Sequence, residues 1–218
     1  MKLETDADIT GWGQAYTSHG REQAIASAVH RLSPTLDGMD PFCIKRFMTT
    51  APNSIIGAGK ETAAAAAGIE IALWDIVGKA LNAPVHRLLG GPCRDRIGVY
   101  ANCWSHAPRS PDELATFAAE QVKQGFKAVK VYPFLYGNTV SDGAACLEVV
   151  RDAVGPDVSI FVDMWYRMNN DELPQIINVL HTYGVSWFED PADATDVEAL
   201  VRIRASQTCR LYQARHCF

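Results

Sequence analysis

The sequence predicts an α/β fold: a partial parallel (β/α) barrel of the TIM type, with about four and a half strand–helix units, preceded by an incomplete α+β domain. The main observation is a series of short apolar runs between Gly125 and Asp190, at 126–132, 158–163 and 185–190. These runs are rich in β-branched and aromatic residues and are bounded by turn residues, which is typical of strands buried on both faces. The segments between them have helical patterns, and strands that alternate with helices form parallel sheets.

The composition is that of an ordinary globular protein and excludes several classes of function. The chain has 218 residues, of which 48% are hydrophobic and 21% charged, and its net charge is −5. Since there is no basic run, neither nucleic acid nor an anionic membrane is expected as a partner. No apolar run approaches the roughly 18 residues that a membrane span needs, and residues 1–10 are too polar for a signal peptide. We therefore expect a soluble cytoplasmic protein.

The six cysteines indicate neither a zinc site nor a disulfide framework. None forms a C-x-x-C pair, and their spacing is irregular: Cys43, Cys93, Cys103, Cys146, Cys209 and Cys217. Such cysteines are typical of small buried side chains in a protein of a reducing compartment.

The first part of the chain predicts a hairpin followed by helices. Residues 3–13 contain two short strand patterns around an Asp-rich turn, and a hairpin of this size is only marginally stable alone. Helical patterns follow over Glu22–Leu32 and from Gly59, where a run of alanines precedes apolar residues at three-and-four spacing. A short helix is predicted over Pro84–Leu89, because proline suits the first helical turn.

The Gly-Gly-Pro sequence at 90–92 predicts a boundary between two domains, residues 1–92 and 93–218. Beyond it, a strand is predicted over Ile97–Cys103. Ser110 is placed to form a capping box at the start of the next helix, because a glutamate follows three residues later. Further helices are predicted to begin at Ser141, near Asn170 and at Thr195, the last with a capping box to Glu198.

The predicted strand centres recur about every thirty residues, which is typical of a (β/α) barrel: Val99, Val129, Ile160 and Trp187. A closed barrel of this type has eight strands. Only four are predicted here, with a doubtful fifth at Cys209–Tyr212. The count predicts a fragment or a truncated gene product, with two open sheet edges that another chain would cover.

Ionisable side chains are predicted at the carboxyl ends of the strands, where parallel barrels place their chemistry. Alternate residues of a strand face the same side, so Lys130 and Tyr132 share one face, and Asp163 and Glu189 end the next two strands. Two carboxylates from neighbouring strands are suitable ligands for Mg²⁺, which binds hard oxygen atoms. The alternative is that both carboxylates cap the strand ends or form ion pairs with Lys130.

Several stretches resemble the mandelate racemase/muconate lactonizing enzyme branch of the enolase superfamily. They cover nearly the whole chain in the family's order: TDADITGWGQ at 5–14, AAGIEIALWDIVGK at 66–79, PVHRLLGG at 84–91, FVD at 161–163 and WFEDP at 187–191. The resemblance implies that the first domain is the family's α+β capping domain and that the second is the amino-terminal half of its barrel. It also implies that family sequence is missing at both ends.

The resemblance implies a reaction in which a base removes the proton next to a carboxylate, while Mg²⁺ held by three carboxylates binds that carboxylate. It implies that Asp163 and Glu189 are the first and second metal ligands and that Asp190 points away from the metal. The family's Lys-x-Lys motif is replaced by Lys-Val-Tyr, so Lys130 corresponds to the lysine that polarises the substrate carboxylate. Tyr132 is left as an acid, a base or a space-filling residue.

Two further departures concern the pocket and the third ligand. Trp165 stands where the family often has asparagine, and it is expected either to shape the substrate pocket or to pack. Residues 209–218 lack the Gly-Glu sequence that would supply the third metal ligand, and His216 is not assigned as a base.

We therefore expect a fragment of a Mg²⁺-dependent enzyme of the enolase superfamily whose substrate is a small carboxylate, a sugar acid, and whose full-length form is a homo-oligomer. The missing lysine base favours an aldonate or aldarate dehydratase. The alternatives are a racemase or cycloisomerase of the same superfamily, and a non-catalytic remnant that assembles through its open barrel edges. The isolated chain is expected to be inactive.

Overall fold

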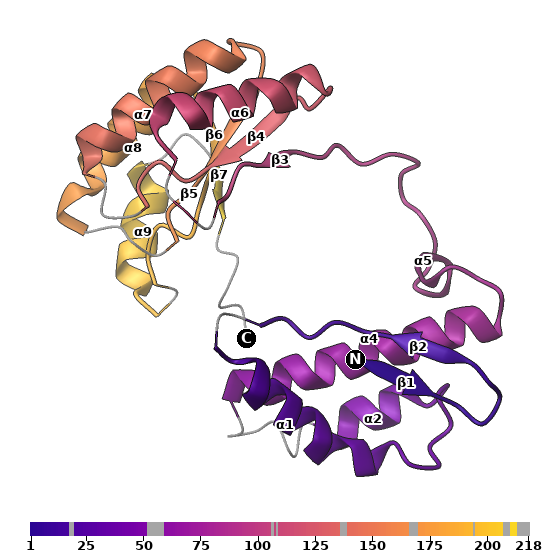
Figure 1. The fold of residues 1–218 in the computed structure, drawn as a ribbon. Coiled ribbons are helices and arrows are strands. Elements are labelled where there is room, and N and C mark those ends of the chain that lie inside the picture. Colours follow the sequence, from indigo (N-terminus) through magenta and orange to yellow (C-terminus); the bar gives the residue numbers. More distant parts are fainter. Residues whose placement is uncertain are drawn as a thin grey trace. The chain divides into compact units, whose positions relative to one another are not determined.

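The computed structural model describes residues 1–17, 20–51, 59–105, 107, 109–135, 139–165, 170–193, 195–206 and 210–212. The chain divides into two compact units, Met1–Arg96 and Ile97–Phe218 (Figure 1). Each unit has its own hydrophobic core. None of the helices described is both long and apolar enough to span a bilayer.

The first unit combines a two-stranded antiparallel sheet with helices. Strands β1 (Lys2–Glu4) and β2 (Thr10–Trp12) pair around Leu3 and Gly11. The helices are α1 (Glu22–Leu32), a 3₁₀ turn at Ser33–Thr35, α2 (Ile44–Thr50), α4 (Gly59–Ala80) and α5 (Val85–Leu88). The predicted hairpin and helices are therefore present, and Asn82 ends α4 in the left-handed conformation, with a φ of 49°.

Helix α4 is the centre of the first unit, and its alanines permit close packing. Ala65, Ala66 and Ile69 are buried with the apolar faces of α1 and α2. Strand β2 lies so close to the helix that a Cβ atom at Gly11 would collide with the carbonyl group of Ala72. The run of alanines thus has a packing function.

The second unit is a five-stranded sheet with strand order β3-β4-β5-β6-β7, in which every pair is parallel. The strands are β3 (Ala101–Asn102), β4 (Ala128–Val131), β5 (Ser159–Asp163), β6 (Val185–Glu189) and β7 (Arg210–Tyr212). The connections contain α6 (Pro111–Lys123), α7 (Val140–Val154), a 3₁₀ turn at Asn170–Glu172, α8 (Leu173–Thr182) and α9 (Val197–Ser206). Four strand–helix units followed by a fifth strand confirm the predicted partial barrel.

One face of this sheet packs against the helices. The side chains on that face are almost fully buried, and they belong to the same core as apolar residues of α6, α7 and α8: Val129, Val131, Ile160, Val162 and Phe188. Because side chains alternate along a strand, the residues between them face the opposite side, which corresponds to the interior of a barrel. That second face carries the ionisable residues.

Of the local predictions, that for the first barrel strand was only partly right, and that for the cap of the following helix was right. The first barrel strand is shorter than Ile97–Cys103, because pairing begins where Ala101 meets Val129; Ile97 and Val99 are 77% and 67% exposed. The capping box of Ser110 and Glu113 is present.

The cap predicted at Thr195 with Glu198 is wrong. The Asp196 carboxylate accepts the hydrogen bond from the Ala199 backbone N–H, while Thr195 donates its hydroxyl to Asp193. Helix α9 therefore begins at Val197. A capping box that sequence reasoning missed, Thr139 with Asp142, begins α7 at Val140 rather than Ser141.

Candidate active site at the carboxyl ends of the strands

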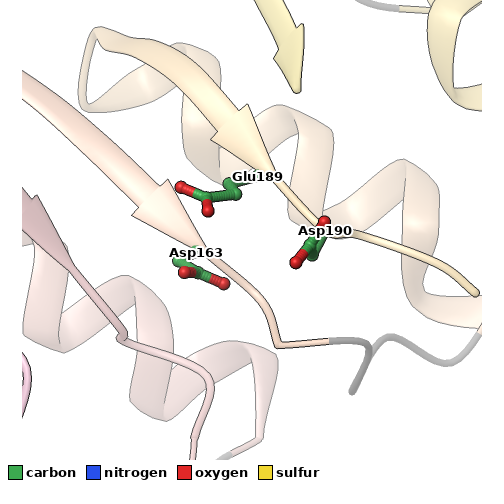
Figure 2. A group of neighbouring side chains, drawn as sticks. All are labelled: Asp163, Glu189 and Asp190. Carbon is green, nitrogen blue, oxygen red and sulfur yellow. The ribbon is translucent and has the colours of Figure 1, made fainter. Parts of the chain in front are cut away.

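Three carboxylates meet where β5 and β6 end. Asp163 and Glu189 are the last residues of these strands and are partners in the parallel register, so their side chains lie next to each other. Asp190 follows directly. Figure 2 shows the three side chains gathered at the ends of the two strands. One oxygen atom from each of the three carboxylates lies within 4.8 Å of the others, and all three residues are buried. The predicted convergence of Asp163 and Glu189 is therefore present in the structure.

The prediction that Asp190 points away from this cluster is wrong. The resemblance to the family implied it, but β6 ends at Glu189 and the alternation of strand residues does not continue to Asp190. Asp190 has a φ of 46°, in the left-handed region, and this turn of the backbone brings its carboxylate beside the other two. A third carboxylate is thus available within the described residues, although the sequence predicted that the chain lacks one.

Lys130 lies against two of these carboxylates. Its ammonium Nζ donates hydrogen bonds to Glu189 Oε2 at 2.8 Å and to Asp163 Oδ2 at 3.2 Å, and the residue is 6% exposed. Burial alone would lower the pKa of Lys130, but the hydrogen bond to Glu189 and the neighbouring negative charges outweigh burial and raise it. The lysine is therefore a charged partner of the cluster, as in the ion-pair alternative that the sequence left open.

The cluster suits a hard divalent cation. Three buried carboxylates meet, and Lys130 contacts two of them, Asp163 and Glu189. Buried charges need partners or a bound metal ion. All the donors are carboxylate oxygens, which Mg²⁺ prefers. The side chains that are present therefore fit the metal that the sequence predicts.

Tyr132 follows β4 directly and is half-buried. Its hydroxyl donates to Asn102 Oδ1 at 3.1 Å, and the centre of its ring lies 5.5 Å from Lys130 Nζ. Burial, more than any other cause, raises the pKa of Tyr132 to about 12, although the Lys130 charge opposes the shift. The phenol is therefore neutral near pH 7 and suits hydrogen-bond donation better than proton abstraction.

An aromatic group lies on the same face of the sheet, one step nearer the amino ends of the strands. The rings of Phe161 and Trp187 stack with their centres 4.4 Å apart. The Tyr100 ring contacts both edge-on, and its centre is 5.4 Å from that of Phe161 and 5.5 Å from that of Trp187. Lys130 Nζ is 5.7 Å from the centre of the Tyr100 ring. Because aromatic rings exclude water from one side of the charged groups, they strengthen the electrostatic interactions there. Sequence reasoning assigned no role to Tyr100, because it placed the strand centre at Val99.

A second aromatic group borders the carboxylates. The Trp165 backbone N–H donates to Asp163 Oδ1 at 2.9 Å. The ring of Trp165 stacks on that of Trp104 with the ring centres 6.1 Å apart, and the Tyr132 ring centre lies 6.4 Å from that of Trp165. Sequence reasoning missed Trp104, although its place just after a barrel strand was a usable signal.

Two family models match the chain and together cover nearly all of it. The amino-terminal domain of mandelate racemase/muconate lactonizing enzyme matches residues 1–90, and the enolase C-terminal domain-like model matches residues 113–217. The chain belongs to the mandelate racemase/muconate lactonizing enzyme branch of the enolase superfamily. The resemblance inferred from the sequence is thereby confirmed, and the five-stranded sheet is part of an enolase-superfamily barrel.

Similar members of the superfamily have different activities. The N-succinyl-L-Arg/Lys racemase of Bacillus cereus is 31% identical over 94% of this chain and 54% of its own length. The D-galactonate dehydratase of Klebsiella pneumoniae is 31% identical over 100% of this chain and 58% of its own. The chain also resembles the crystal structure of the 3,6-anhydro-D-galactonate cycloisomerase of Zobellia galactanivorans, with 27% sequence identity and a TM-score of 0.88. The match covers 97% of this chain and 58% of the cycloisomerase chain. The chain spans about half the length of the curated relatives it matches.

Proposed function

We propose that this chain carries the metal-binding and carboxylate-binding part of an active site that removes the proton next to a carboxylate, and that the protein is a Mg²⁺-dependent sugar-acid dehydratase acting on an aldonate or aldarate. The observation that carries the proposal is the buried cluster of Asp163, Glu189 and Asp190 in contact with Lys130. Membership of the superfamily makes abstraction of an α-proton the expected chemistry.

The three carboxylates are proposed to hold the metal ion. Bound Mg²⁺ would supply the positive charge that stabilises the substrate carboxylate as negative charge builds up on it. Asp163 and Glu189 are held in register by the sheet, and the hydrogen bond from Met164 N–H to the Glu189 carbonyl, at 2.9 Å, ties the two strand ends together. This rigid support keeps the ligand oxygens within reach of one ion.

Lys130 is proposed to bind the substrate carboxylate. Its ammonium is charged and lies against two of the proposed ligands, so a substrate carboxylate bound beside them would be within its reach. The hydrogen bond would strengthen as negative charge develops, which is the condition for catalysis rather than simple binding. Tyr132, as a neutral phenol, is proposed to exchange its hydrogen bond to Asn102 for one to a substrate oxygen.

In the proposed dehydration, a base takes the proton from the carbon next to the carboxylate and the C–O bond on the following carbon breaks. The departing hydroxyl takes one proton from an acid and leaves as water, so the substrate loses one water in all. The resulting enol rearranges to a 2-keto-3-deoxy acid. The D-galactonate dehydratase of Klebsiella pneumoniae, which matches the whole of this chain, supports this reaction.

Racemisation and cycloisomerisation are the alternatives within the superfamily, and the racemase of Bacillus cereus matches at the same identity. Racemisation needs a base on each face of the substrate's α-carbon. A phenol whose pKa is raised to about 12 is a poor base, so the pair Lys130 and Tyr132 favours dehydration. Homo-oligomerisation, a cytoplasmic location and inactivity of the isolated chain stay predictions.

The test is product analysis with Mg²⁺ present. Because the isolated chain is predicted to be inactive, D-galactonate, D-gluconate and galactarate are each incubated with the full-length form, and mass spectrometry monitors the loss of one water. Proton NMR in D₂O then separates the alternatives, because a racemase exchanges the α-proton without losing water. Asp163→Asn should reduce product to background, whereas Asp157→Asn, at an exposed turn, should not. If EDTA leaves the turnover unchanged, the metal-dependent mechanism is wrong.

A noncatalytic remnant is the rival from another class, and calorimetry separates it from the enzyme. A chain that uses the cluster should bind Mg²⁺, and Asp163→Asn should weaken that binding at least about tenfold. A chain that shows no Mg²⁺ binding at all would favour the remnant.

A further inference from the structure

We propose that Trp104, Tyr132 and Trp165 form a specificity surface, the aromatic wall, which selects sugar acids whose end remote from the carboxylate is apolar, such as a deoxy sugar acid. This inference rests on the proposed function and narrows its substrate class. It starts from a side-chain arrangement outside the metal cluster, of which the proposed chemistry uses only the Tyr132 hydroxyl.

The sheet topology gathers the three rings at one edge. Trp104 lies two residues beyond β3, Tyr132 directly after β4 and Trp165 two residues beyond β5, and these three strands are neighbours. The two indoles stack with an interplanar angle of 24°, and Tyr132 is tilted against Trp165 by 55°. All three side chains are partly exposed, and none belongs to the buried core of the described residues. The rings therefore form a surface rather than part of the core.

The aromatic wall is fixed to the groups proposed to bind the substrate carboxylate. The Trp165 backbone donates to Asp163, and the Tyr132 ring is 5.5 Å from Lys130 Nζ. The Tyr132 hydroxyl is already bonded to Asn102. A substrate whose carboxylate lies at Lys130 thus has the Tyr132 ring within the length of its own carbon chain, and the Trp165 ring is the next along the wall.

Ring faces attract C–H groups and methyl groups, and they provide poor partners for a hydroxyl. When the hydroxymethyl end of a substrate is buried against these rings, its hydroxyl group is left without a hydrogen-bond partner, which costs free energy. A methyl end instead gains free energy from burial. An apolar site discriminates against an added hydroxyl by up to about a hundredfold. Asparagine in place of Trp165 would instead offer a hydrogen-bonding partner.

The experiment compares two acids that differ by one hydroxyl group. D-galactonate and its 6-deoxy counterpart are titrated by calorimetry into the chain in the presence of Mg²⁺. We expect the deoxy acid to bind at least about tenfold more tightly to the unmodified chain. Trp165→Phe should keep most of this ratio, because the ring remains, whereas Trp165→Asn should reduce it to near one.

The outcomes separate this inference from the proposed function. Circular dichroism confirms that each variant is folded, and Trp12→Phe, at an exposed position in the first unit, controls for the loss of an indole. Equal binding of both acids by the unmodified chain, or an unchanged ratio in Trp165→Asn, overturns the aromatic wall while leaving the metal chemistry intact. Failure of both acids to bind, with or without Mg²⁺, overturns the proposed function and this inference with it.

Discussion

Replacing Lys130 by methionine removes the positive charge that the structure places against the carboxylate cluster. The ammonium is buried and contacts Glu189 and Asp163 at 2.8 and 3.2 Å, so methionine leaves both carboxylates without this partner. Loss of one member of a buried ion pair costs about 3–5 kcal/mol. We therefore expect Lys130→Met to lower the free energy of unfolding by about 3–5 kcal/mol in EDTA.

Magnesium should reverse much of this loss. An ion at about 100 times its dissociation constant stabilises the folded state by about 2.7 kcal/mol. The gain should be larger in Lys130→Met than in the unmodified chain, because the ammonium no longer repels the cation. The assay is urea unfolding followed by circular dichroism, in EDTA and over a series of Mg²⁺ concentrations. Lys127→Met is the matched control, since Lys127 is exposed just before β4.

Three results would refute the reasoning. If Lys130→Met and Lys127→Met were equally stable in EDTA, the two short contacts of Lys130 would contribute nothing to the fold. If Mg²⁺ stabilised neither the unmodified chain nor Lys130→Met, the carboxylates would not form a cation site. A gain from Mg²⁺ that is smaller in Lys130→Met would show that the lysine assists the ion rather than competing with it.

Three further predictions follow. Asp163→Asn should weaken Mg²⁺ binding at least about tenfold, measured by calorimetry, whereas the exposed Asp157→Asn should leave it unchanged. Ser110→Ala removes the hydrogen bond that the Glu113 N–H donates to Ser110 Oγ and should cost about 1 kcal/mol in urea unfolding; no loss would contradict a stabilising cap. At pH 8 an alkylating reagent should modify exposed Cys93 much faster than buried Cys146, because burial raises the pKa of Cys146 to about 11 and keeps it protonated; equal rates in peptide mass spectrometry would contradict this.

Much of the site could be predicted because it depends on regular strands. Short apolar runs located β4, β5 and β6, and alternation then placed Lys130, Asp163 and Glu189 on one face at the carboxyl ends. In a parallel sheet the register follows from these positions, so the convergence of the three residues needed no knowledge of loops.

The prediction failed where regular structure ends. The pairing that shortens β3 and the choice of Asp196 over Thr195 as a helix cap depend on where the backbone leaves the strand or enters the helix. Several side chains near such a boundary have the right chemistry for the same hydrogen bond, so a sequence pattern alone does not choose among them.

Asp190 and Trp165 show the same limit at the site itself. Each follows a strand and has a left-handed backbone, with φ of 46° and 49°, a conformation that costs non-glycine residues free energy. Asp190 thereby joins the carboxylates, and Trp165 directs its N–H to Asp163. Strained residues persist where the surrounding contacts determine them, and here both lie beside the buried charges. The left-handed backbone thus places the Asp190 carboxylate and the Trp165 ring at the ends of β6 and β5, the two strands that carry Glu189 and Asp163. The alternation of side chains along a regular strand would not have placed them there.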